Sequence, residues 1–241
     1  MGNYNSTIQQ GSGRGRWGMA IGKRAFDLTT EAFRASGLQG GKEVSSYRDK
    51  LDHLFKQFAA KVPPSSNPLT NARFLFNWLW MTKPARYRPS GHFKLNDVID
   101  AQMSQDRRDI GNCLGLTVFY NCLFQKMGIQ AEVLYLEMAF GRGPHVLTLL
   151  RTEQSQIDIE NILSDGFDYR GHLNIPRRVR WSDKELVADI YLSQGNESFE
   201  KCKYSDALKN YDMAIHLNPR YEKAHVNKAI LIDEMGMEGR G

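Results

Sequence analysis

The chain has 241 residues, of which 41% are hydrophobic and 24% charged, so it can bury one sizeable core and a smaller module. Its three cysteines form no CxxC pair, and an odd number without a secretory segment is not a disulfide framework. No apolar run approaches the roughly 18 to 20 residues that a membrane helix needs. We therefore expect a soluble, cytoplasmic protein without a membrane span. The net charge of +5 permits contact with nucleic acid but does not argue for it.

Residues 1–22 are rich in Gly, Ser, Asn and Gln and have little apolar periodicity, which predicts a disordered tail. The tail opens with a short pattern for N-myristoylation at Gly2, a pattern that also arises by chance. A single acyl chain would give only marginal membrane binding.

Helices dominate the next part of the chain. Apolar residues that recur at three- and four-residue steps predict helices over residues 23–33, 44–62, 71–81 and 95–103. The third of these is so dense in aromatic side chains that a buried helix is expected there. Asn112 is a good N-cap, so a further helix is predicted over 113–127, with Gly128 as its stop.

Strands are predicted after these helices. Runs of strand length, rich in β-branched residues and leucine, cover residues 131–137 and 145–151, and 156–160 is a plausible third strand. The glycine-rich segment 141–144 is the turn or loop between the first two. Residues 23–181 are thus expected to form an α+β domain, with helices first and a small antiparallel sheet second.

A helical module is predicted over residues 182–241, opening with a capping box from Ser182 to Glu185. Small and large packing residues then follow a 34-residue helix-turn-helix period. They are Tyr191, Gly195, Phe199, Tyr204, Ala207, Leu208, Tyr211, Ala214, Leu217 and Pro219. This pattern resembles the tetratricopeptide repeat family, with about one and a half repeats present. Since a repeat buries its apolar face on a neighbour, the module leans on the central domain or belongs to a longer array, and we favour the array.

Three residues in the central domain suggest acyl-transfer chemistry. Cys113 lies in the predicted first turn of a helix, where the positive end of the helix dipole favours a thiolate. His145 opens a predicted strand, and Asp158 lies between two isoleucines, which directs its carboxylate to the opposite face. Glu160 lies on the same side as Asp158 and is the substitute for it. Taken alone, a cysteine in an apolar helix is more often structural, and Cys122 is read as core.

The order of these residues resembles the transglutaminase-like branch of the papain-like cysteine fold, over roughly residues 44–173. More closely, the segment Leu95-Asn96-Asp97-Val98-Ile99 before the cysteine and Gly143-Pro144-His145 before the strand resemble a bacterial subgroup in which such a domain precedes tetratricopeptide repeats. The resemblance implies Cys113 as nucleophile, His145 as general base and then acid, and Asp158 as the carboxylate that orients the imidazole. Crosslinking members often have an aromatic residue after the cysteine and Ala-Trp after the histidine, where this chain has Leu114 and Val146-Leu147. The acyl acceptor is therefore left open.

The sequence also offers candidates for the groups that would assist the three catalytic residues. The backbone N–H of Cys113 is the natural first oxyanion donor, with Gln102 or Gln105 as side-chain candidates and Asn112 beside the cysteine. No cofactor or metal is expected, since the histidines lack paired metal-ligand spacing and the glycines form neither a P-loop nor a dinucleotide fingerprint.

Two functions compete, and a third is weaker. The first is a cysteine-dependent hydrolase or acyltransferase that acts on a peptide or side-chain amide, while the repeats recruit a protein partner. The alternative is a non-catalytic interaction scaffold, in which the repeats hold a peptide in a groove that contains Asn196 and Asn227. A lysine that often accompanies these asparagines is replaced by Leu192, which argues against a peptide carboxylate as ligand. Nucleic-acid binding through the basic cluster at 177–180 rests on charge alone.

Overall fold

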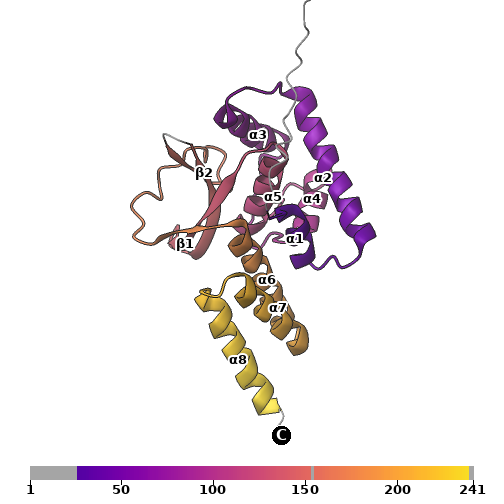
Figure 1. The fold of residues 1–241 in the computed structure, drawn as a ribbon, viewed down its shortest axis with the longest axis vertical. Coiled ribbons are helices and arrows are strands. Elements are labelled where there is room, and N and C mark those ends of the chain that lie inside the picture. The colour runs from indigo at the N-terminus through magenta and orange to yellow at the C-terminus, as the bar shows by residue number, and fades with distance from the viewer. Residues whose placement is uncertain (1–25, 153–154, 239–241) are drawn as a thin grey trace, which may run out of the picture.

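The computed structural model describes residues 26–152 and 155–238 (Figure 1). The predicted disordered tail over 1–22 and the N-myristoylation pattern at Gly2 lie outside this part of the chain. Within it, the fold combines helices with a small antiparallel sheet, as the α+β expectation requires.

Helices form the first half of the described chain. They are α1 (Leu28–Ala35), α2 (Gly41–Lys61), α3 (Pro68–Thr82), α4 (Leu95–Met103) and α5 (Cys113–Lys126). All five predicted helices are present, and the ends of the last four lie within three residues of the prediction. The first, predicted over 23–33, is observed from Leu28 to Ala35, and residues 23–25 of that prediction lie outside the described part of the chain. Local capping explains two of the starts, because the side chains of Asn67 and Asn112 accept hydrogen bonds from the first-turn N–H groups of α3 and α5. Gly128, at a φ of 71°, supplies the left-handed residue that follows α5.

The sheet follows α5 in the chain. Its strands are β1 (Ala131–Ala139), β2 (Gly143–Arg151), β3 (Gln156–Ile159) and β4 (Arg178–Trp181), all antiparallel in the order β3-β2-β1-β4. The first three correspond to the predicted strands. The fourth was not predicted, because its two arginines, Arg178 and Arg180, mark it as a basic cluster rather than as a strand. β4 pairs with β1 at the edge of the sheet, where polar side chains remain in solvent.

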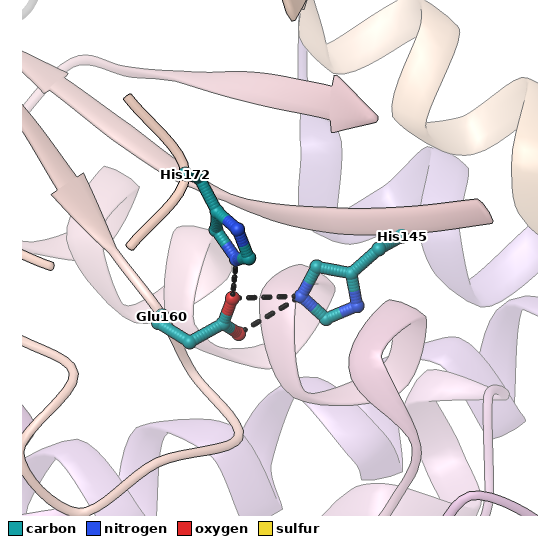
Figure 2. A group of neighbouring side chains, drawn as sticks. All are labelled: His145, Glu160 and His172. Atoms are coloured by element: carbon teal, nitrogen blue, oxygen red, sulfur yellow. Dashed lines mark hydrogen bonds and ion pairs between the residues drawn. The ribbon is translucent and has the colours of Figure 1, made fainter. Parts of the chain in front are cut away.

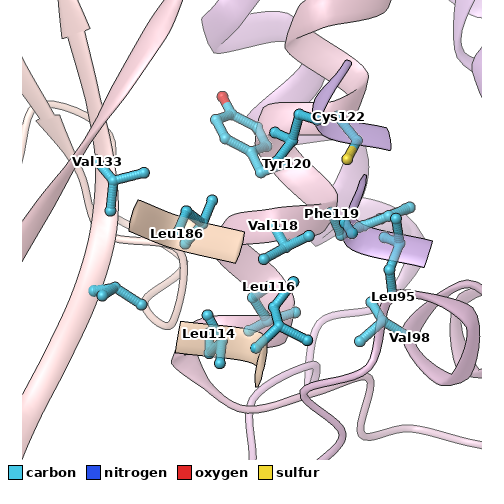
Figure 3. Close-up of a cluster of buried hydrophobic side chains, with 14 of the residues drawn as sticks. Leu95, Val98, Leu114, Leu116, Val118, Phe119, Tyr120, Cys122, Val133 and Leu186 are labelled. Atoms are coloured by element: carbon cyan, nitrogen blue, oxygen red, sulfur yellow. The ribbon is translucent and has the colours of Figure 1, made fainter. Parts of the chain in front are cut away.

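The core is centred on α5, which is buried on all sides between the sheet and the other helices (Figures 1 and 3). Figure 3 shows α5 side chains among residues of α4, β1 and α6, with Val98, Val133 and Leu186 as examples. Alternate residues of the strands face the opposite way and form a smaller cluster under the β3–β4 connection. Its members are Leu134, Leu136, Ala139, Leu147 and Leu149, with Ile175 packed on them.

The C-terminal part is an antiparallel hairpin of α6 (Asp183–Glu200) and α7 (Tyr204–Leu217), followed by α8 (Glu222–Glu238). The predicted capping box is present, and the Ser182 N–H donates to the Glu185 carboxylate at 2.5 Å. Gly195 lies so close to the Tyr211 ring that a Cβ at this position would be 2.5 Å from it. Tyr221, between α7 and α8, joins this part to the sheet: its ring lies 5.2 Å from that of Trp181 on β4 at the centroids, and Trp181 stacks on Tyr135 of β1 at 4.2 Å.

None of the helices in the described ranges combines the length and the apolar character needed to cross a membrane.

Candidate functional site

Cys113 is the first residue of α5, and its side chain is partly exposed. The Asn112 side chain accepts from the Gly115 N–H at 3.0 Å, so the helix begins at the cysteine, as the sequence predicted. The backbone around it is tightly packed: a Cβ at Gly115 would lie 2.2 Å from the carbonyl oxygen of His92. The thiol is thereby held at the helix N-terminus, where unpaired N–H groups favour negative charge.

His145 lies near the start of β2 and joins the cysteine to a carboxylate. Its side chain is hydrogen-bonded to that of Cys113. Its Nε2 lies 2.9 and 2.8 Å from the two carboxylate oxygens of Glu160 (Figure 2). Since Nε2 donates to the carboxylate, Nδ1 is the ring nitrogen left for the thiol. The three side chains form one hydrogen-bonded chain from sulfur to imidazole to carboxylate.

The electrostatics of this chain favour an ion pair. Burial by itself lowers the pKa of His145, but the hydrogen bonds to Cys113 and Glu160 outweigh it and raise the pKa to about 9. Burial tends to raise the pKa of Glu160, but the hydrogen bonds from His145 and His172 bring it below its ordinary value. A protonated His145 at neutral pH therefore faces a carboxylate on one side and the cysteine on the other.

The carboxylate at His145 belongs to Glu160, not to Asp158, which corrects the first choice of acid. The Asp158 side chain is buried and makes a bidentate ion pair with Arg178, at 3.0 Å (Oδ1) and 2.9 Å (Oδ2). The reason is the register of the sheet. Asp158 is paired with Leu149 of β2. Leu149 lies four residues along the strand from His145, which is about 13 Å at the usual rise per residue. Glu160 lies two residues beyond Asp158 and so nearer to the histidine.

A buried polar network fixes the segment that carries Glu160. The side-chain amide of Asn161 donates to the hydroxyls of Thr117 at 3.1 Å and Thr148 at 2.9 Å. Thr148 in turn donates to Asn121 at 2.7 Å. The network ties the residue after Glu160 to both α5 and β2, which carry the cysteine and the histidine. Their relative positions thus depend on the core rather than on a mobile loop.

Two further residues at the site carried no signal in the sequence. His172 lies in the connection between β3 and β4, and its Nε2 is 2.8 Å from Glu160 Oε2. Tyr87 precedes α4 and interacts electrostatically with Cys113 and Glu160; burial is the main cause that raises its pKa, followed by the cysteine. Neither is part of a periodic pattern, and their proximity to the cysteine depends on how loops fold over the sheet.

One group among the described residues has the composition and spacing of a metal site. Donor atoms of His145, Glu160 and His172 all lie within 4.8 Å of one another, and two imidazoles with one carboxylate suit Zn²⁺. No metal-ligand spacing in the amino-acid sequence predicts this group, because the three residues come from the start of β2, the end of β3 and a loop. Their contacts are ordinary hydrogen bonds of 2.8 to 2.9 Å, in which both Nε2 atoms are already satisfied by the carboxylate.

The two glutamines suggested as oxyanion donors lie elsewhere. Gln102 is buried on α4 and donates to the Thr82 hydroxyl at 3.3 Å. Both Gln102 and Gln105 line a cavity of about 500 Å³ that also includes His53 and Trp78. That placement corrects the expectation for them. Asn112 uses its side chain as the helix cap.

Asn196 and Asn227, expected in a peptide groove, are brought together by α6 and α8. The Asn227 amide donates to Asn196 Oδ1 at 2.7 Å, and the Tyr211 hydroxyl donates to the same oxygen at 3.0 Å. The pair thus holds the helices of the module to one another.

The basic cluster at 177–180 is balanced by acids. Arg177 pairs with Glu137 at 3.2 Å, and Arg180 lies 3.9 Å from Glu132. Arg178 is committed to the buried Asp158. These partners weaken the case for nucleic-acid binding there, which rested on unpaired positive charge.

Comparison of the chain with protein-family models, curated proteins and solved structures found no match to any of the three. The fold and the site define a class only: a protein of mixed helix and antiparallel sheet with Cys113, His145 and Glu160 in one hydrogen-bonded chain.

Proposed function

We propose that the protein is a cysteine-dependent enzyme that cleaves or transfers an acyl group at a peptide or side-chain amide. The observation that supports this is the hydrogen-bonded chain from Cys113 through His145 to Glu160. A nucleophile, a base and a group that orients the base are the parts that covalent acyl transfer requires. Placement of the thiol at a helix N-terminus, next to a protonated imidazole, favours the thiolate form.

In the first half of the reaction, the Cys113 thiolate attacks the carbonyl carbon of the amide. The tetrahedral intermediate collapses to a thioester as the C–N bond breaks, and His145 gives its proton to the departing nitrogen. The backbone N–H of Cys113, which has no earlier helical turn to pair with, is the natural donor to the oxyanion.

In the second half, water or an amine attacks the thioester and His145 accepts its proton. The C–S bond breaks and restores the thiolate and imidazolium pair. Glu160 keeps the imidazole oriented throughout and stabilises its charged form. Whether water or an amine is used separates hydrolysis from acyl transfer, and the site residues are compatible with either.

The sequence resemblance to transglutaminase-like proteins gains support from this geometry once Glu160 replaces Asp158 as the acid. The carboxylate still follows the histidine in the chain and still contacts its imidazole. The C-terminal hairpin with α8 remains a proposed tetratricopeptide module that recruits a protein partner.

The scaffold alternative also has a specific observation in its favour. On α8 the side chains of Val226, Ile230, Ile232 and Met235 are exposed, and several exposed apolar side chains on one helix are typical of a helix that packs against something else. Because partner binding and catalysis would use different parts of the chain, the Cys113→Ala variant separates the two functions. Partner capture that persists without turnover is expected for the enzyme, and no turnover in the wild type would favour the scaffold.

A thiol-alkylation assay tests the activation of Cys113. Iodoacetamide is added near neutral pH, and each cysteine is followed by mass spectrometry. We expect Cys113 to react fastest, faster than the exposed Cys202, which serves as the internal control for access. Cys122 should react slowest, because burial raises its pKa to about 12. Equal rates at Cys113 and Cys202 would remove the case for an activated nucleophile.

A trapping experiment tests the covalent step. The protein is incubated with peptides that carry glutamine amides and with peptide amide substrates, then quenched in acid. An acyl adduct on Cys113 that hydroxylamine removes is the expected thioester. The Cys113→Ser variant serves as the matched control, since its oxygen ester, if one forms, should be much less sensitive to hydroxylamine. No adduct across both substrate classes would contradict amide acyl transfer.

A further inference from the structure

His172 is the buried group at the site that the reaction above does not use. It is 3% exposed and lies in the connection between β3 and β4, and its Nε2–H donates to Glu160 Oε2 at 2.8 Å. Figure 2 shows the Glu160 carboxylate between the two imidazoles, His145 on one side and His172 on the other. A carboxylate that catalysis uses to orient one histidine is therefore itself held by a second.

Glu160 needs such a partner. Its side chain is fully buried, and burial disfavours the charged carboxylate unless hydrogen bonds compensate. Two imidazoles provide such bonds, His145 to both carboxylate oxygens and His172 to Oε2, and the Ile162 N–H makes a longer one of 3.4 Å to Oε1. Oε2 accepts hydrogen bonds from both His145 and His172, so both lone-pair directions of this oxygen are occupied.

His172 is itself fixed in place. Its ring contacts Phe140 and Tyr169 at centroid distances of 4.9 and 4.8 Å. Its backbone carbonyl accepts from Arg178 Nη1 at 2.9 Å, and the same guanidinium holds the carboxylate of Asp158. Asp158 thus acts on the site at a distance, by anchoring the arginine that anchors His172.

We propose that His172 is a positioning residue that keeps Glu160 ionised and aimed at His145. The inference rests on the function proposed above. The charged form of Glu160 stabilises the imidazolium of His145, which in turn favours the Cys113 thiolate. Loss of the His172 donor makes protonation of the buried carboxylate easier. As the pH is lowered, the thiolate–imidazolium pair is then lost at a higher pH than in the wild type.

The groups that determine this pH dependence come from several elements. Those that face Glu160 directly or through one neighbour are His145, His172, Cys113, Tyr87 and Tyr169. Arg178 and Asp158 lie behind His172. Because every variant below leaves the other members unchanged, a shift in the pH profile reports on the bond between His172 and Glu160.

The first experiment compares His172→Phe with His172→Gln. The amide of glutamine can donate to Glu160 much as Nε2 does, whereas phenylalanine fills the space without a donor. The rate of Cys113 alkylation is followed over the acid limb of its pH profile. For His172→Phe we expect the half-maximum to move up by about one pH unit, the size of a hydrogen bond to a buried charge. In His172→Gln the half-maximum should lie close to the wild-type value. An unmoved half-maximum in His172→Phe, or equal shifts in both variants, would overturn the proposal.

A second measurement needs no variant and stays decisive if His172→Phe does not fold. Long-range ¹H–¹⁵N NMR on the wild-type protein gives the protonation of each ring nitrogen of His172. The proposal requires a proton on Nε2, and a neutral ring protonated only at Nδ1 would refute it. If Cys113 proves no more reactive than Cys202, the enzyme function fails, while the NMR result still decides whether His172 donates to Glu160.

Discussion

The assignment of Glu160 as the orienting acid leads to the sharpest prediction, for the Glu160→Gln variant. The substitution keeps the size of the side chain and removes its charge. In the wild type, burial opposes the charged form of His145, yet bonds to Cys113 and Glu160 hold its pKa at about 9 instead of the ordinary 6.5. That difference corresponds to about 3 kcal/mol in favour of the imidazolium, at about 1.4 kcal/mol per pH unit.

If the carboxylate supplies about half of this stabilisation, its neutralisation lowers the ratio of thiolate–imidazolium pairs to neutral pairs roughly tenfold. We therefore expect Cys113 in Glu160→Gln to react with iodoacetamide roughly tenfold more slowly than in the wild type. The amide also presents one acceptor oxygen to two imidazole donors, which costs about 1–3 kcal/mol of stability. Circular dichroism under the assay conditions establishes that the variant is folded.

Asp158→Asn is the matched control, because it neutralises the neighbouring buried carboxylate on the same face of the sheet. It leaves Arg178 without its charge partner, so we expect a loss of stability with a smaller effect on Cys113 than Glu160→Gln has. The reasoning would be refuted, and Asp158 restored as the acid, if Cys113 reacted at the wild-type rate in Glu160→Gln and slowly in Asp158→Asn.

Three further predictions concern stability. The free energy of unfolding of the wild type should decrease as the pH rises from 6.5 to about 9: the folded state binds the His145 proton more tightly than the unfolded state, so this stabilisation is complete below pH 6.5 and lost through the folded pKa. Urea titrations should find that slope reduced in His145→Phe, and an identical slope would count against the shift. Asn112→Ala removes the cap bond to the Gly115 N–H and should cost about 1 kcal/mol, measured in the same titrations, with no change contradicting the cap. Gly115→Ala would ordinarily stabilise a helix, but its Cβ meets the His92 carbonyl oxygen at 2.2 Å, so we expect a loss of about 1–3 kcal/mol and a lower melting temperature; a gain would show that the backbone there yields easily.

Much of the secondary structure was accessible from the sequence because its signals are local. The helix at Leu95–Met103 has the predicted bounds, and Asn112 caps α5 as expected. The strand at Arg178–Trp181 was missed for a physical reason. It is short, lies at the sheet edge and exposes two of its side chains, so nothing in its composition distinguishes it from a basic loop.

For the candidate site, too, the sequence predicted the features that depend on neighbouring residues and missed those that depend on contacts between distant segments. The period of two along a strand is local, so the sequence placed Asp158 and Glu160 on one face as candidate acids. It could not choose between them, because the choice depends on the register of β3 against β2. Register is a contact between segments, and it places the glutamate, not the aspartate, at the histidine.

The amino-acid sequence by itself thus determined the order of the elements, the cap that puts Cys113 at a helix N-terminus, and the residue types available for chemistry. Only the tertiary structure decided which of them meet: His145 with Glu160, Asp158 with Arg178, and His172 behind the carboxylate. Helix caps and side-chain periodicity arise from neighbours along the chain, whereas the partners of a buried charge are selected by the packing of distant segments around it.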